Sequence, residues 1–300
     1  MLTIPEEASQ EIEKRIADFS DDNSHTIFLV GSKSVGKTTL LNSFLDKTDT
    51  PRETLVLEYS FGRKSNQRQA IEKMLCHVWE YGGKLDNNML NTIVASVLSH
   101  GNIFFCIMVD LSKIKTIWNT LEICLEAVPK TYKESEISSE LIIICGKYDL
   151  FKNYDSDIKK FICTTLRSVA LIYNAHLLFY SSKEPQLAKR AKELFHNIGF
   201  GTFSSFKDKN TNFAKPLVIS NKTDSWESIG LPTSTIEEIK LRHLSRIPPE
   251  AHVEVTEVVK APRHTHPEPV LDAKVTLKYE ELRNLPTLDI SIDDYLVGIK

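Results

Sequence analysis

The sequence lacks the cysteine patterns that mark disulfide-bonded or metal-binding proteins. It contains no C-x-x-C pair and no metal-ligand spacing among its five cysteines, which are Cys76, Cys106, Cys124, Cys145 and Cys163. Cys106 and Cys145 lie inside apolar runs, where a thiol behaves as a small hydrophobic side chain. An odd number of cysteines without metal spacing is typical of a reducing compartment, so we expect a cytosolic protein.

Long apolar runs and a strong excess of one charge are also missing. The longest apolar runs, residues 103–109 and 141–145, are far too short to span a bilayer. The N-terminal region is acidic and lacks the apolar core of a signal peptide. We therefore expect no direct insertion into a membrane, and any membrane association would depend on a partner. A formal net charge of −3 argues against nucleic acid as the main partner.

The stretch around which the chain is organised is residues 26–45. Residues 26–30 are apolar and rich in β-formers, as expected of a buried strand. They lead directly into G-S-K-S-V-G-K-T at residues 31–38, a full match to the phosphate-loop pattern G-x-x-x-x-G-K-[ST]. Residues 39–45 then continue with helical spacing. A strand before the motif and a helix after it are the context that a phosphate loop requires, although a glycine-rich turn can match the pattern by chance.

Each residue type in this loop has a physical role in binding phosphate. Gly31 and Gly36 allow backbone conformations that a Cβ would block, so that backbone N–H groups turn toward an anion at the start of the helix. Lys37 would place its ammonium on the β- and γ-phosphates, and the Thr38 hydroxyl would ligate Mg²⁺. The candidate phosphate-binding residues are Gly31, Ser34, Gly36, Lys37, Thr38 and Thr39.

The rest of the first two thirds of the chain alternates between strand-like and helix-like segments. Strands are expected at residues 54–61, 75–79, 103–110, 141–145 and 175–179, and helices at residues 87–98, 116–128, 156–173 and 185–198. This alternation predicts an α/β fold with a mostly parallel six-stranded sheet and helices on both faces. In such a sheet, ligands bind beyond the carboxyl ends of the strands, where the candidate site residues fall.

Three regions follow from this pattern. Residues 1–22 are expected to be an N-terminal helical arm, with apolar residues on one face of residues 6–19. Residues 23–202 form the nucleotide-binding domain. Residues 203–300 are a C-terminal extension with one candidate strand at 215–220 and one short helix from a capping box of Ser234 and Glu237. Prolines break the remainder into short pieces, which we interpret as extended segments that dock on another surface or as an unstructured tail.

Two segments indicate that the nucleotide is a guanine nucleotide. Asp149, in G-K-Y-D at residues 146–149, follows a strand and can accept hydrogen bonds from N1–H and the exocyclic amine of guanine, which adenine does not offer. Lys147 would lay its stem across the base. Ser182 and Lys183 belong to S-S-K at residues 181–183, which is similar to the S-A-K loop of guanine-binding proteins. Gly146 stands where the pattern N-K-x-D has asparagine, so we expect reduced affinity.

The residues expected for hydrolysis depart from those of active GTPases. W-E-Y-G-G at residues 79–83 is similar to the W-D-x-G-G segment of small GTPases, with Glu80 in place of the aspartate that supports Mg²⁺. Lys84 stands where a glutamine would orient the attacking water, and lysine has no acceptor for that purpose. Thr54 is a candidate for the first-switch threonine, although a threonine within a strand is the more common interpretation. The candidate metal-site residues are Thr38, Thr54 and Glu80, and we expect slow or absent hydrolysis and no catalytic residue.

Several segments together resemble one family, the light intermediate chains of cytoplasmic dynein. These segments are G-S-K-S-V-G-K-T-T, T-L-V-L-E-Y-S-F-G-R-K, W-E-Y-G-G, F-C-I-M-V-D-L-S-K, I-C-G-K-Y-D and K-P-L-V-I-S. The resemblance covers roughly residues 20–230. It is strongest to the form that belongs to dynein-2, the motor of retrograde intraflagellar transport in cilia. Residues 129–140 look shorter than the family usually has.

The resemblance implies a Ras-like P-loop GTPase fold and a role in a motor complex. In that family the Ras-like domain packs on the tail of the dynein heavy chain and stabilises it, and the nucleotide is structural or degenerate rather than a switch. The partners so implied are the dynein-2 heavy chain, other dynein-2 subunits and the intraflagellar transport machinery. The implied location is the cytoplasm, the cytoskeleton and the cilium. The resemblance does not identify the heavy-chain contact residues, because no short motif for them is visible; the helix that carries Trp118 and the chain after residue 203 are no more than candidates.

Two other functions compete with a non-catalytic dynein-2 subunit. An active regulatory small GTPase of vesicle or ciliary trafficking is favoured by the complete phosphate loop. A kinase or ATPase that uses an adenine nucleotide is disfavoured by Asp149 and by the lack of a recognisable acceptor site. The nature of the bound nucleotide and the rate of its hydrolysis would distinguish the three.

Overall fold

The computed structural model describes residues 25–48, 50–65, 73–97, 102–128, 139–201, 206, 209–249 and 269–284. The predicted N-terminal helix at residues 6–19 lies outside the described residues. The chain divides into two compact units, of which the first extends to Glu250 and the second comprises Ala251–Lys300. Each unit is therefore described separately.

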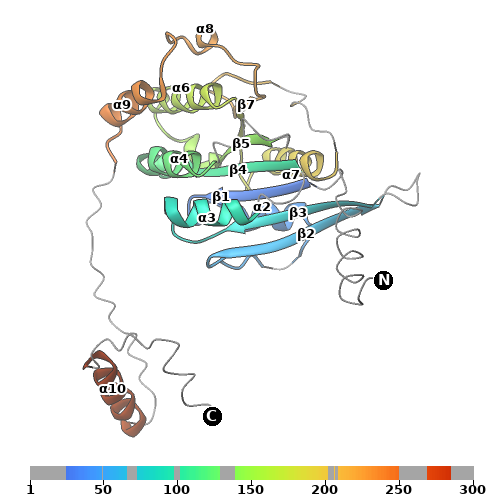
Figure 1. Ribbon diagram of the computed structural model, residues 1–300. Helices are drawn as coiled ribbons and strands as arrows, with labels where there is room; N and C mark the ends of the chain where they lie inside the picture. The colour runs from blue at the N-terminus through green and yellow to red at the C-terminus, as the bar shows by residue number, and fades with distance from the viewer. Residues whose placement is uncertain are drawn as a thin grey trace, which may run out of the picture. The chain divides into compact units, whose positions relative to one another are not determined.

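A seven-stranded sheet forms the centre of the first unit, in the order β2-β3-β1-β4-β5-β6-β7 (Figure 1). All neighbouring strands from β3 to β6 are parallel, whereas β2 and β7 pair antiparallel at the two edges. The α/β fold with a mostly parallel sheet is thus confirmed, with β7 as a seventh strand. The strands are β1 (His25–Gly31), β2 (Leu57–Ser65), β3 (Lys73–Tyr81), β4 (Asn102–Asp110), β5 (Ser139–Gly146), β6 (His176–Phe179) and β7 (Val218–Ile219).

Helices cover both faces of this sheet, because the central strands are apolar on both faces. Alternate residues of β1 point to different cores: Phe28 and Val30 pack with α3, α4 and α6, whereas Ile27 and Leu29 pack with α2 and α7. The helices are α2 (Lys37–Phe44), α3 (Asn87–Val97), the 3₁₀ turn η1 (Ile114–Thr116), α4 (Ile117–Glu126), α5 (Tyr148–Phe151), α6 (Ser156–Ile172) and α7 (Pro185–Phe200).

Two strands differ in extent from the sequence-based expectation. β2 begins at Leu57 rather than at residue 54 and continues to Ser65, beyond its expected end at residue 61. Thr54 therefore precedes the strand, so its interpretation as a strand residue is wrong. β3 extends beyond residue 79 to Tyr81 and thus includes Glu80. The extended pairing of β2 with β3, from Leu57 opposite Tyr81 to Ser65 opposite Lys73, accounts for both shifts.

The segment after residue 202 continues the first unit rather than leaving it. β7 adds to the edge of the sheet, and the following helices are α8 (Trp226–Ile229) and α9 (Ile236–Arg246). α9 packs against α6 and α4, which buries Trp118 and makes it a poor candidate for an external surface. The capping box is formed by Thr235 and Glu238 instead of Ser234 and Glu237.

The second unit contains a helix where the sequence predicts extended segments. This helix, α10 (Pro269–Asn284), begins at a proline, a residue that is well suited to the first position of a helix. The interpretation of prolines as breaks within this stretch is therefore wrong for residues 269–284. Within the described ranges, no helix combines the length and the apolar character that a membrane span requires.

Candidate nucleotide-binding site

The phosphate loop connects β1 to α2 and has the backbone that its glycines predict. Gly36 immediately precedes α2 with a φ of 105°, and Ser34 also has a positive φ, of 57°. Gly31 has a φ of 140°, and a Cβ there would lie 1.9 Å from the carbonyl oxygen of Met108 on the neighbouring strand β4. Only glycine fits at position 31, because the loop must pass directly over β4.

Lys37, the first residue of α2, directs its ammonium group back into the phosphate loop. Its Nζ donates hydrogen bonds to the carbonyl oxygens of Gly31 at 3.2 Å and Ser32 at 3.0 Å. Burial lowers the pKa of Lys37, and the nearby Glu80 carboxylate opposes this effect. The side chain is therefore a partly desolvated cation inside the loop, where an anion would be attracted strongly.

Residues 51–54, which we call the first switch segment, and the end of β3 complete a cavity of about 230 Å³ in front of the phosphate loop. The Thr38 hydroxyl donates a hydrogen bond of 2.7 Å to Oε1 of Glu80. Thr54 is brought to the same cavity, and its hydroxyl donates to Glu58 at 3.1 Å. The residues that line the cavity are Lys33, Ser34, Gly36, Lys37, Thr38, Thr39, Pro51, Arg52, Glu53, Thr54, Glu80 and Gly82.

The three predicted metal-site residues thus line one cavity. Their hydroxyl and carboxylate oxygens are the hard ligands that Mg²⁺ prefers. Glu80 is only 4% exposed, and burial raises its pKa, while the Thr38 hydrogen bond and the Lys37 charge act in the opposite direction. A buried carboxylate of raised pKa would gain from a bound cation, so the residues fit Mg²⁺ beside a phosphate group.

The residues predicted to read the base lie at the ends of β5 and β6, outside the lining of that cavity. Asp149 accepts a hydrogen bond of 2.7 Å from the Ser181 hydroxyl and pairs with Lys183 at 3.2 Å. Burial raises the pKa of Asp149, but these two partners outweigh burial and hold it below the ordinary value. The carboxylate is therefore ionised and held in place by these two side chains. Ser182 is an exposed residue of the adjoining turn.

Lys147 has a role that the sequence did not predict. It adopts a left-handed backbone conformation with a φ of 59°, and its Nζ lies 2.7 Å from Oδ2 of Asp110, at the end of β4. Asp110 is fully buried and also accepts hydrogen bonds from the backbone N–H and hydroxyl of Ser112. The pair fastens the turn after β5 to the end of β4. Its only signal in the sequence is an aspartate as the last residue of a buried strand.

The packing of the phosphate loop explains why position 146 is a glycine. A Cβ at Gly146 would lie 2.7 Å from Cγ2 and 3.1 Å from the carbonyl oxygen of Val35, in the phosphate loop. The loop and the turn are thus in direct contact, and Val35 fills the space that an asparagine side chain would use.

The sequence also did not predict the exposed ion pair of Lys33 with Glu53 at 2.8 Å, which joins the phosphate loop to the first switch segment.

No group suited to activating water is found at position 84. Lys84 is exposed and does not line the cavity, and its carbonyl oxygen accepts a hydrogen bond of 2.6 Å from the Tyr81 hydroxyl. Gly82 approaches the first switch segment closely, since a Cβ there would lie 1.9 Å from the carbonyl oxygen of Thr54. The first switch segment and the residues that follow β3 therefore touch at backbone level beside the cavity.

The mostly parallel sheet, the phosphate loop and the G-K-Y-D turn define the class of the protein as a Ras-like P-loop domain. In agreement, residues 26–149 match the family described as Roc, the Ras of Complex domain of DAPkinase. Relatives that cover most of the chain identify its family more narrowly. The chain belongs to the cytoplasmic dynein 2 light intermediate chains.

Three relatives with that name support this assignment. The chain is 32% identical to cytoplasmic dynein 2 light intermediate chain 1 of Danio rerio, over 78% of this chain and 73% of the relative. It is 32% identical to the Bos taurus protein, over 87% and 84%, and 31% identical to the Homo sapiens protein, over 80% and 79%.

A solved structure agrees in fold. The crystal structure of the conserved domain of a dynein light intermediate chain matches 76% of this chain and 92% of its own, with a TM-score of 0.50 and 11% identity.

Proposed function

We propose that this chain is a non-catalytic, GTPase-like subunit of the cytoplasmic dynein-2 motor. In this role it binds the tail of the heavy chain and stabilises it, which supports retrograde intraflagellar transport and cilium assembly. The observation that carries the proposal is the 31–33% identity to cytoplasmic dynein 2 light intermediate chains over about three quarters or more of each chain. The subunit would act in the cytoplasm, on the microtubule cytoskeleton and in the cilium.

The proposed ligand of the site is a guanine nucleotide with Mg²⁺, held as a structural element. Three observations support this: the pKa of the Asp149 carboxyl is lowered, the Lys37 ammonium lies inside the phosphate loop, and the Thr38 hydroxyl contacts the Glu80 carboxylate. The same site supports a lack of catalysis, because Lys84 offers no acceptor for water and is exposed. Nucleotide extracted from freshly purified protein would test this: GDP or GTP is expected, and ATP or ADP would contradict it.

The motor role is tested by removing the chain from ciliated cells. We expect the amount of ciliary dynein-2 heavy chain to fall and transport cargo to accumulate at ciliary tips. Affinity purification of the tagged chain should also recover the heavy chain and other dynein-2 subunits. Unchanged heavy-chain levels and normal cilia in cells without this chain would contradict the proposal.

An active regulatory GTPase of vesicle or ciliary trafficking is the second candidate. One observation favours it: the phosphate loop is complete, and Thr38 and Glu80, joined by a hydrogen bond, both line the cavity. A single-turnover GTP assay of the purified chain distinguishes the two. A measurable rate that disappears in Lys37→Ala would favour the active enzyme, whereas the proposed subunit shows no rate that depends on Lys37.

A further inference from the structure

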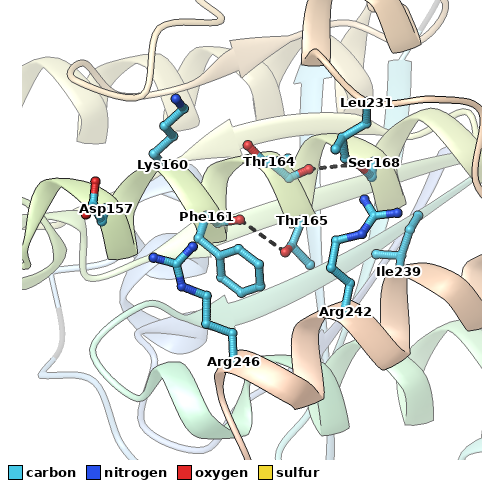
Figure 2. Close-up of a pocket in the computed structure, with 10 residues that line it drawn as sticks. All are labelled: Asp157, Lys160, Phe161, Thr164, Thr165, Ser168, Leu231, Ile239, Arg242 and Arg246. Atoms are coloured by element: carbon cyan, nitrogen blue, oxygen red, sulfur yellow. Dashed lines mark hydrogen bonds between the residues drawn. The ribbon is translucent and has the colours of Figure 1, made fainter.

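A second cavity, of about 360 Å³, lies between α6 and α9 (Figure 2). It shares no lining residue with the cavity in front of the phosphate loop. α6 contributes one wall and α9 the other, with Leu231 from the preceding loop at one end. The residues that line it are Asp157, Lys160, Phe161, Thr164, Thr165, Ser168, Leu231, Ile239, Arg242 and Arg246. We refer to it as the α6–α9 groove.

The charge of the groove is strongly unbalanced. Its lining contains three cations, Lys160, Arg242 and Arg246, and a single carboxylate, that of Asp157, although the chain as a whole has a formal net charge of −3. Among the described residues, none of the three cations lies within 4.0 Å of a carboxylate oxygen. By contrast Arg167, on the same helix α6, is paired with a carboxylate. The groove therefore presents positive charge that the described part of the chain does not neutralise.

The two arginines extend from α9 into the α6–α9 groove (Figure 2). Arg242 and Arg246 are one turn apart on α9, and Figure 2 shows their guanidinium groups extending from α9 toward α6. Arg246 lies over the ring of Phe161, with its Cζ 4.8 Å from the ring centroid, and so remains extended across the groove. Arg242 donates one hydrogen bond of 3.0 Å to the Ser234 hydroxyl. Each planar guanidinium retains donors that match a carboxylate or a phosphate.

The floor of the groove is partly apolar, which favours a ligand that has an apolar group as well as negative charge. Phe161, Leu231 and Ile239 supply hydrocarbon surface. The hydroxyls of Thr165 and Ser168 donate to the carbonyl oxygens of Phe161 and Thr164, at 3.1 Å and 2.9 Å (Figure 2). Their protons are thus used within α6, and the donors left for an anion are those of the lysine and the arginines. The three cations are spread over two helices instead of converging on one point.

We propose that the α6–α9 groove binds an acidic peptide segment of a partner protein. Carboxylate or phosphate groups of the segment pair with Arg242, Arg246 and Lys160, and an apolar side chain between them packs on Phe161. Separate cations around an apolar floor fit a chain with several acidic groups better than one small anion, and charge complementarity makes the partner acidic. The proposal does not depend on nucleotide binding or on the dynein-2 role.

Fluorescence anisotropy with the full chain tests the proposal. The probe is a fluorescein-labelled peptide of about twelve residues, with glutamates on both sides of a central leucine. A comparison peptide has glutamine in place of every glutamate. A phosphoserine version and inorganic phosphate, added as competitors, distinguish the sources of the anion. The main variant is Lys160→Gln/Arg246→Gln, because neither side chain makes a hydrogen bond with another residue that the structure describes. The control, Lys189→Gln/Lys215→Gln, removes two exposed cations from other surfaces.

The glutamate peptide is expected to bind at least tenfold more tightly than the glutamine peptide, and binding should weaken as salt is raised. The main variant should weaken it by roughly tenfold or more, since hydrogen bonds to charged groups are lost, and the control by less than twofold. Thermal unfolding checks that the variants are folded. The single variant Lys160→Gln, which changes an exposed side chain, provides an independent measurement of peptide affinity. No binding, equal binding of the two peptides, equal weakening by the control, or displacement by equimolar inorganic phosphate would each overturn the proposal.

Discussion

The side chain of Val35 fills the space that any side chain at position 146 would need. A Cβ on Gly146 would lie 2.7 Å from Cγ2 of Val35, and the methyl of Met108 lies 3.3 Å away on another side. The phosphate loop and the turn that carries Lys147 and Asp149 are therefore packed against each other through a glycine. The departure from the asparagine of the guanine pattern is a consequence of this packing.

We expect Gly146→Asn to destabilise the chain although it restores the guanine pattern. Inserting the side chain must displace Val35 or the loop, so the free energy of unfolding should fall by about 1–3 kcal/mol, as for other overpacked cores. Urea unfolding of the nucleotide-free chain measures this. Val35→Ala/Gly146→Asn is the matched control, and it should recover part of the loss. An unchanged stability in Gly146→Asn would contradict the packing explanation.

A second prediction concerns Glu80, whose pKa is raised above the ordinary 4.5, first by burial. The folded state holds this proton more tightly than the unfolded state, so stability falls as the pH rises from about 4.5 through the raised pKa. Without Mg²⁺ at pH 7, Glu80→Gln should therefore raise the free energy of unfolding. The amide oxygen can still accept the Thr38 hydrogen bond.

Thermal unfolding of both proteins between pH 4 and pH 8, with and without Mg²⁺ and GDP, measures the effect. Wild type should gain stability from Mg²⁺ with GDP, while Glu80→Gln should gain less, because the neutral amide attracts the cation less strongly. If the variant is less stable than wild type at pH 7 without Mg²⁺, the Glu80 carboxylate is stabilising and this account is wrong.

The sequence predicted the central elements because their signals are local. The apolar runs of β1, β4 and β5 and the phosphate loop need only neighbouring residues to be recognised. By contrast, the start of β2 depends on its partner β3, and the threonine at position 54 reaches the cavity because Gly82 lets two backbones approach. Such contacts join residues far apart in sequence, and spacing alone does not contain them.

The same reason explains other features that the sequence did not predict. The strand at 215–220 was only a candidate, because two paired residues, Val218 and Ile219, suffice to complete the sheet edge. The Lys147–Asp110 pair and the burial of Trp118 under α9 depend on tertiary packing. The capping box was displaced by one residue, since Ser234-Thr235 and Glu237-Glu238 offer two registers of the same pattern.

A third prediction concerns the ion pair that fastens the segment after β7 to α6. Arg167 donates to both carboxylate oxygens of Asp224, at 2.8 Å and 2.7 Å, and both side chains are less than a tenth exposed. Asp224→Ala leaves a buried guanidinium with only the Ser228 hydroxyl as a described side-chain partner, so we expect a loss of about 3–5 kcal/mol in the free energy of unfolding. Chemical denaturation measures the loss.

The control for this prediction is the apolar pair Arg167→Met/Asp224→Leu, which should be much closer to wild type in stability. Burial raises the pKa of Asp224, but the Arg167 interactions outweigh it and hold the pKa below 3.8. The stability from this pair is therefore complete above about pH 4 and is lost as the pH falls through the lowered pKa. A small effect of Asp224→Ala would mean that residues 209–249 are not firmly attached to the sheet domain.

The last prediction concerns His243 on α9, whose ring lies 5.6 Å from that of Trp118 and stacks on Phe161 at 5.8 Å. It is 1% exposed, neither ring nitrogen has a hydrogen-bond partner among the described residues, and burial lowers its pKa to about 4. The unfolded chain binds the proton near pH 6.5, so stability should fall by about 3 kcal/mol as the pH drops from 6.5 to 4. His243→Phe keeps a ring in place and removes this contribution. Unfolding curves of both proteins at pH 7 and pH 5 should therefore diverge toward acid, with the variant the more stable, and parallel curves would show that His243 does not titrate within the fold.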